Sequence, residues 1–123
     1  MVIAIIGLLA TVVLASLGTA RAKARDARRM ADLDAIKKAL AVYQTSTSSL
    51  PVLATTTLDG TDFVSTELAS ANILAAMPAD PNTPAYSYQY SSVDGKTYTF
   101  YFCLETTSVP GHTADCNNAM SFT

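Results

Sequence analysis

The sequence predicts an α+β fold in which one long N-terminal helix packs on a small antiparallel β-sheet. Three observations predict it. The first twenty residues are uncharged and almost entirely apolar, a helical apolar pattern continues from there to Tyr43, and two aromatic-rich segments within residues 85–104 alternate like the strands of a hairpin. The length of 123 residues allows one compact domain beside such a helix.

Residues 1–20 are expected to span a membrane or to form the core of an assembly. Twenty residues at ~1.5 Å each give a helix of roughly 30 Å, the thickness of the bilayer hydrocarbon. A signal peptide would carry its basic residues before the apolar run, and a helix of a soluble core would be shorter, so neither alternative fits as well. The residues expected in this surface are Val2, Ile3, Ile5, Ile6, Gly7, Leu8, Leu9, Val12, Val13, Leu14 and Leu17.

Residues 21–44 are expected to continue the same helix in amphipathic form. One stripe, spaced by three and four residues, contains Met30, Leu33, Ile36, Leu40 and Tyr43. Beyond Tyr43, a run of Ser and Thr followed by Pro51 replaces helix formers with turn formers. We therefore expect one helix on the order of 65 Å long that ends near Tyr43.

Residues 45–123 are expected to form a globular head. Residues 45–84 have the composition of a long loop region, with a short helix near residues 66–77 and an extended, rigid approach to the first strand marked by Pro78, Pro81 and Pro84. Residues 85–91 and 97–104 flank Asp94-Gly95 and predict a β-hairpin over 85–104. Its aromatic face is the expected partner of the apolar helix stripe.

Cys103 and Cys116 are expected to form a disulfide that closes residues 103–116. Pro110-Gly111 lets the chain double back between them, and closing a loop of about fifteen residues stabilises by roughly 3 kcal/mol. A disulfide would indicate an oxidising, extracytoplasmic location. Two unpaired buried thiols are an alternative, and a metal pair is a weaker one because only His112 could add a ligand.

Charge is distributed unevenly between the helix and the head. Seven of the eight Lys and Arg lie within residues 21–38, which carry a net charge of +4, whereas the chain from Ala39 onward carries −6. This asymmetry predicts contacts between subunits, although a solvated helix face is nearly as good an interpretation. The candidate inter-subunit charge contacts are Arg21, Arg25, Asp26, Arg28, Arg29, Asp32 and Asp34. Nucleic-acid binding is a minor alternative that the pattern does not indicate, because the acidic head would repel phosphate.

No pattern of an enzyme is found. The chain has no Gly-rich phosphate loop, nucleophile motif or telling pair of carboxylates, so we predict no catalytic residue and no cofactor. Asp80, Asp94 and Asp115 do not have the spacing of a calcium loop, and no metal site is predicted.

Two segments carry a family resemblance. Val2-Ile-Ala-Ile-Ile-Gly-Leu-Leu-Ala10 followed by Ala22-Lys-Ala-Arg-Asp-Ala-Arg-Arg29 resembles the N-terminal helix of type IV pilins and of the pseudopilins of type II secretion. Met77-Pro-Ala-Asp-Pro81, Tyr86-Ser-Tyr-Gln-Tyr90 and Asp94-Gly-Lys-Thr-Tyr98 are similar to later parts of the same family, whereas residues 44–76 show no resemblance.

The resemblance implies a structural subunit that polymerises with identical subunits into a helical filament at the cell surface. Before assembly, the helix would hold the subunit in the membrane with its head outside, until an assembly machinery extracts it. One alternative is a pseudopilin of a type II secretion system, and another is a single-pass membrane-anchored binding module that never polymerises. Asp26→Lys is expected to lower the yield of filaments while leaving the head folded.

The resemblance also implies a short basic leader, cut by a prepilin peptidase, upstream of the residue at which this sequence begins. Such a leader would resolve a conflict, because the basic residues between Arg21 and Arg29 would otherwise keep the following domain in the cytoplasm, where disulfides are rare. Ala15 stands where the family commonly has a proline. We therefore expect any unwinding of the helix in a filament at Gly18 with Ser16 and Thr19.

Overall fold

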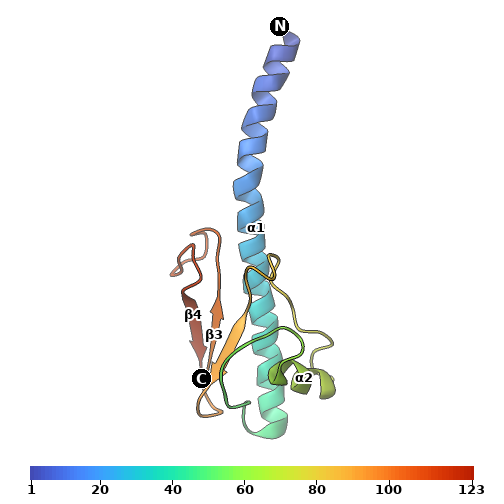
Figure 1. The fold of residues 1–123 in the computed structure, drawn as a ribbon, viewed down its shortest axis with the longest axis vertical. Coiled ribbons are helices and arrows are strands. Elements are labelled where there is room, and N and C mark those ends of the chain that lie inside the picture. The colour runs from blue at the N-terminus through green and yellow to red at the C-terminus, as the bar shows by residue number, and fades with distance from the viewer.

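The structure, a computed structural model that describes all residues 1–123, has the predicted α+β architecture (Figure 1). Its elements in chain order are α1 (Val2–Thr47), β1 (Leu53–Thr57), α2 (Phe63–Ser70), β2 (Gln89–Ser92), β3 (Tyr98–Phe102) and β4 (Asn118–Phe122). The strands form one antiparallel sheet in the order β1-β2-β3-β4. The first half of α1 projects beyond the head, and its second half lies against the head (Figure 1).

Helix α1 continues four residues beyond the predicted end at Tyr43. Its last three residues are Thr, Ser and Thr, and their hydroxyl groups donate hydrogen bonds to carbonyl oxygens three or four residues back in the helix. These poor helix formers therefore remain compatible with the helical backbone. The helix ends at Ser48, which adopts a left-handed φ of 64° and donates its N–H to the carbonyl of Gln44 at 2.9 Å.

The predicted hairpin is confirmed as β2 and β3, with Tyr90 opposite Phe100. Its first strand begins at Gln89 and not at residue 85, because residues 81–85 form a turn in place of the predicted extended approach. In the turn between the strands, Gly95 has a φ of 68°, and a Cβ there would lie 3.1 Å from the carbonyl oxygen of Leu50. Glycine is therefore required at this position.

Three further elements differ from expectation. Strands β1 and β4, which flank the hairpin, were not predicted, and β1 and α2 interrupt the predicted loop region over 45–84. The short helix was expected near residues 66–77 but begins at Phe63. The carboxylate of Asp62 accepts a hydrogen bond from the N–H of Ser65 at 3.1 Å and so caps the helix at this earlier position.

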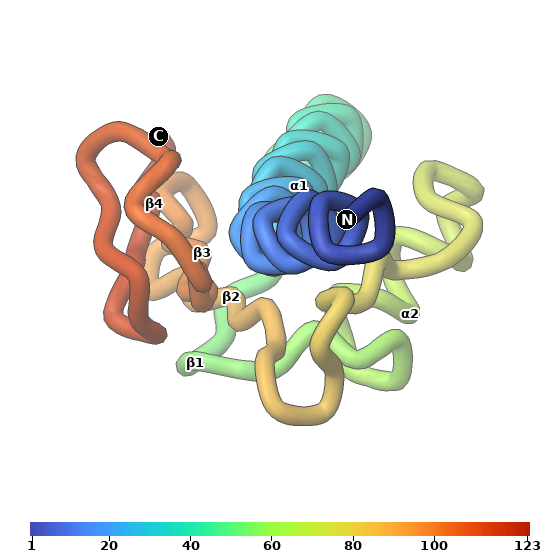
Figure 2. Tube along the Cα trace, turned by 90° about the horizontal axis from the view of Figure 1, so that it is seen from above, coloured from blue at the N-terminus to red at the C-terminus, as the bar shows by residue number.

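The core forms where the apolar stripe of α1 meets the aromatic face of the sheet, as predicted. Leu33, Ile36 and Leu40 are buried in one cluster with the inward-facing aromatic residues Tyr88, Tyr90, Phe100 and Phe102. Seen along the helix, the sheet lies on one side of α1 and α2 lies on another (Figure 2). The head is thus built around the second half of α1 only.

Candidate assembly surface and its charged base

The first half of α1 is an apolar helix that nothing in the subunit covers. Its large apolar side chains between Val2 and Leu14 are 57–86% exposed, and Leu17 is 40% exposed. An 18-residue window of α1 has a mean hydropathy of 2.4, and none of that window is buried. By length and composition, α1 can therefore cross a membrane.

The free energy stored in this exposure is large relative to the stability of the head. Fully burying one exposed side chain of this kind contributes roughly 1.5–3 kcal/mol, and the ten Val, Ile and Leu residues of this surface are 40–86% exposed, so together they represent on the order of 10–20 kcal/mol. A folded domain has a net stability of only about 5–15 kcal/mol. Exposed apolar surfaces of this kind mark sites that contact lipid or another protein.

The apolar surface contains small residues that no contact within the subunit requires. A Cβ added at Gly7 would meet no atom within 4 Å, and Ala10 is exposed. A larger side chain at either position would therefore leave the isolated subunit intact and change only what a neighbouring helix meets.

At the base of this surface, Arg29 of α1 is fully buried among three carboxylates. Its guanidinium donates two hydrogen bonds to Asp80 at 2.7 and 3.0 Å, one to Asp26 at 2.7 Å and one to Glu105 at 2.9 Å. Burial alone would lower the pKa of Arg29, but the three carboxylates raise it above its usual value. The group therefore stays charged inside the protein.

Asp26 ties α1 to the chain that follows β3. Its carboxylate accepts hydrogen bonds from the backbone N–H groups of Glu105 at 2.9 Å and Thr106 at 2.8 Å, and from the Thr106 hydroxyl at 2.6 Å. Burial would raise the pKa of Asp26, yet these donors and Arg29 lower it. We refer to the side chains of Arg25, Asp26, Arg29, Asp80 and Glu105 as the ionic network.

Arg25 completes the ionic network at its exposed end. Its Nε donates to Glu105 at 2.8 Å, and a second nitrogen pairs with the other carboxylate oxygen. The hydrogen bond from Arg25, with a further contribution from Arg29, lowers the pKa of Glu105 to about 2 against the opposing effect of burial. The carboxylate is therefore ionised at neutral pH.

The structure corrects the expected roles of several charged residues. Arg25, Asp26 and Arg29 were expected to contact neighbouring subunits, but their side chains pair within the subunit, and those of Asp26 and Arg29 are fully buried. In place of the expectation that Asp26→Lys leaves the head folded, we expect this substitution to destabilise the head, because a second buried cation would face Arg29. Of the remaining candidates, Asp32 accepts the Tyr88 hydroxyl at 2.9 Å, Asp34 pairs with Lys38 at 2.7 Å, and Arg21 and Arg28 are exposed.

Sequence reasoning missed Asp80 and Glu105 as partners of Arg29. They lie 51 and 76 residues away along the chain, and no local spacing connects them. The one available signal was the opposite net charge of the helix and the head. In the structure, part of this opposite charge is paired within a single subunit.

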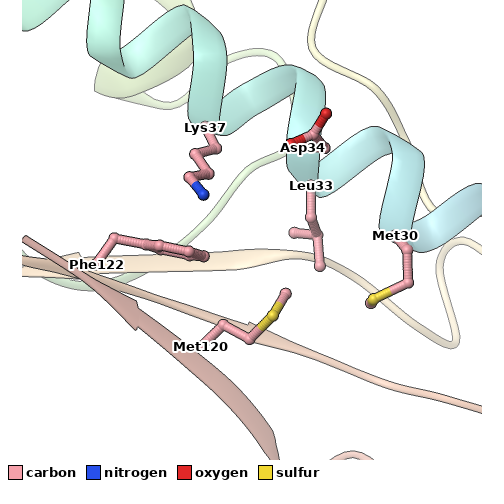
Figure 3. A pocket seen from close by; sticks show the side chains of 6 residues that line it. All are labelled: Met30, Leu33, Asp34, Lys37, Met120 and Phe122. Carbon is pink, nitrogen blue, oxygen red and sulfur yellow. The ribbon is translucent and has the colours of Figure 1, made fainter. Parts of the chain in front are cut away.

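A small cavity lies between α1 and the edge strand β4 (Figure 3). Its volume is about 220 Å³, below the roughly 300–1,000 Å³ of typical ligand pockets. The ammonium of Lys37 lies 4.4 Å from the ring centroid of Phe122 at one end of the cavity. The lining residues are Met30, Leu33, Asp34, Lys37, Met120 and Phe122.

Two further expectations concern the disulfide and the unwinding of α1. Cys103 and Cys116 are bonded to each other, which confirms the predicted disulfide over the free-thiol and metal alternatives. In the subunit, α1 is unbroken through Ser16, Gly18 and Thr19, so unwinding there stays a prediction about the filament.

No family model matches this chain, and neither a curated protein nor a solved structure matches it. The long apolar N-terminal helix, the small antiparallel sheet and the disulfide are together compatible with a pilin-like fold.

Proposed function

We propose that this chain is a structural subunit, a pilin, that polymerises through the first half of α1 into a filament on the cell surface, similar to a type IV pilus. The membrane holds the subunit before assembly, and identical subunits replace the lipid afterwards. The observation that carries the proposal is the uncovered apolar half of α1, whose large side chains between Val2 and Leu14 are at least 57% exposed.

The same surface suits both states because lipid tails and apolar side chains are similar environments. Leaving the membrane need not cost the full transfer free energy, since contacts with neighbouring helices replace contacts with lipid. Association of helices in either setting depends on close packing, which small residues permit. Gly7 and Ala10 lie in the exposed surface and allow such an approach.

The ionic network supports the proposal because it joins the head to α1 directly beyond the apolar half. Asp26 and Arg29 lie roughly two and a half and three and a third helical turns beyond Leu17, the last large apolar residue of that half, and both are fully buried in the head. Identical subunits can pack repeatedly only if each head holds the same orientation relative to its helix. A buried, fully hydrogen-bonded joint at this position supplies that orientation.

A pair of matched substitutions tests the proposal. Gly7→Leu with Ala10→Leu adds bulk to the apolar surface and is expected to overpack a filament core, so filaments sheared from expressing cells should be lost under the electron microscope. Ala69→Leu with Ala71→Leu is the control, because it adds similar bulk at two exposed positions of the head. Its filament yield should equal that of the unmodified chain.

Two results would contradict the proposal. Filaments of normal yield and shape from the doubly substituted chain would show that the first half of α1 does not form the filament core. Monodisperse, water-soluble material with α1 intact, in the absence of detergent, lipid or polymer, would exclude both the membrane and the filament.

A further inference from the structure

We infer that three cations at the base of the apolar helix, Arg21, Lys23 and Arg28, form a docking surface for the anionic headgroups of a phospholipid membrane. We call these three residues the basic collar. The inference rests on the membrane-held state of the proposed function and adds to it a contact between the folded subunit and the membrane surface.

The cations of the basic collar form no close salt bridge within the subunit. Of the five basic residues between 21 and 29, Arg25 and Arg29 turn toward the head and pair with its carboxylates. Arg21 and Lys23 are exposed and form no salt bridge. The side chain of Arg28 is 65% exposed, and its one ionic contact is a loose 3.9 Å approach to Asp32.

Asp32 is a poor partner for Arg28 because another group already uses it. The atom that Arg28 approaches, Oδ2 of Asp32, accepts the hydroxyl of Tyr88 at 2.9 Å. The Arg28 guanidinium can therefore leave Asp32 for a phosphate without stranding a carboxylate that has no other partner.

The basic collar lies at the depth of the headgroups when residues 1–20 fill the hydrocarbon. At ~1.5 Å per residue, Lys23 lies about 3 Å and Arg28 about 10 Å beyond Arg21 along the helix axis. The headgroup layer is roughly 5–8 Å thick on each side of the hydrocarbon. Charges act across about 8–10 Å at physiological salt, so all three cations are within reach of lipid phosphates.

Few free acidic groups oppose the basic collar on this side of the head. The loop closed by the disulfide lies on the side from which the first half of α1 projects (Figure 1). Of its carboxylates, Glu105 is paired with Arg25 and Arg29, which leaves Asp115 exposed. Asp94 lies far away, since its neighbour Gly95 accepts a hydrogen bond from Leu50, beyond the opposite end of α1.

Position favours lipid over a protein or nucleic-acid partner. The acidic head of a neighbour, or a nucleic acid, would have to enter the layer between the head and the membrane. Lipid phosphates already occupy that layer. Charge complementarity and depth therefore point to the same occupant.

A distribution experiment with the full chain tests this inference. The chain in detergent is diluted into an equal mixture of neutral phosphatidylcholine vesicles and vesicles that also contain anionic phosphatidylglycerol, and the two populations are then separated and assayed. Insertion of the apolar helix contributes equally to both, so the ratio reports the headgroup contact. At about fivefold per cation, we expect on the order of 100-fold enrichment in the anionic vesicles at low salt, falling as salt rises.

Two triple substitutions that each remove three positive charges separate the effect of the basic collar from the effect of net charge. Arg21→Gln/Lys23→Gln/Arg28→Gln should distribute almost equally between the two vesicles. The control, Lys37→Gln/Lys38→Gln/Lys96→Gln, removes the same charge from positions at least nine residues beyond Arg28, the last residue of the basic collar, and should keep the enrichment.

The outcomes distinguish failure of this inference from failure of the proposed function. Insertion into both vesicles in equal amounts, or an equal loss in the control, would overturn the role of the basic collar and leave the membrane-held state intact. No insertion into either vesicle would remove the proposed function as well. Equal distribution together with collar-dependent binding to nucleic acid or to a second copy would assign the cations to that partner and overturn the lipid contact.

Discussion

Arg29→Met is expected to lower the free energy of unfolding of the head by about 3–5 kcal/mol, the range for removing one partner of a buried ion pair. Methionine retains much of the arginine stem, so the loss comes from the carboxylates left behind. The side chains of Asp26 and Asp80 are 0% exposed. Without the guanidinium, Asp26 keeps three donors, whereas Asp80 keeps one, the N–H of Asn82 at 2.8 Å. Asp80 therefore carries most of the cost.

The effect is large enough to measure in the full chain. Each kcal/mol shifts the melting temperature of a domain of 60–100 residues by about 4–8 °C, so the variant should melt on the order of 20 °C lower. Urea unfolding in detergent micelles, followed by the near-ultraviolet circular dichroism of the tyrosines, reports on the head. Far-ultraviolet signals are less suitable, because the apolar half of α1 stays helical in the micelle.

The neighbouring arginine provides the control. Arg28→Met removes a side chain that is 65% exposed and makes one 3.9 Å contact, so we expect a change within about 0.5 kcal/mol. Arg29→Lys keeps the charge but not the four hydrogen bonds and should lie between the two. A loss below about 1 kcal/mol for Arg29→Met, or equal losses for both methionine variants, would refute the assigned role of the ionic network.

Three further predictions follow from the same contacts. Because Glu105 has a pKa of about 2 in the folded chain and 4.5 as its ordinary value, its stabilising contribution is complete above pH 4.5 and is lost as the pH falls toward 2; Glu105→Gln should flatten that part of a pH series of unfolding free energies. Tyr88→Phe removes the hydroxyl that donates to Asp32 at 2.9 Å and should cost about 1.5 kcal/mol in urea titrations, whereas Tyr101→Phe on the outer face of the sheet should cost almost nothing. Reducing the disulfide should destabilise the head by roughly 3 kcal/mol, and a thermal melt with and without reductant measures the difference.

The elements that were predicted from sequence are those specified by local patterns. The stripe from Met30 to Tyr43 repeats with the helical period, and the segments on either side of Asp94-Gly95 alternate with the period of a strand. Both patterns survive in the fold, because the stripe and the aromatic face bury each other. The disulfide was also predicted, from the short separation of the two cysteines and the turn signal Pro110-Gly111 between them.

The elements that were missed depend on partners far away in the sequence. Strand β4 reads Asn-Ala-Met-Ser-Phe and has no strong strand pattern of its own; it forms because β3 offers an edge, with Met120 opposite Phe100. Strand β1 reads Leu-Ala-Thr-Thr-Thr and forms in the same way against β2. The ionic network is the extreme case, since neither Asp80 nor Glu105 carries any local sign of its contact with Arg29.

The contact between Asp26 and the chain after β3 has a consequence for the order of folding. The hydrogen-bonded groups are 79 and 80 residues apart in sequence, and closing so long a loop is costly in chain entropy and slow. Synthesis delivers Asp26 early and Thr106 near the end. The apolar helix of the nascent chain is therefore complete well before the contacts that complete the head exist, and a chain that stops before Glu105 lacks the hydrogen bonds that join Asp26 to the segment after β3.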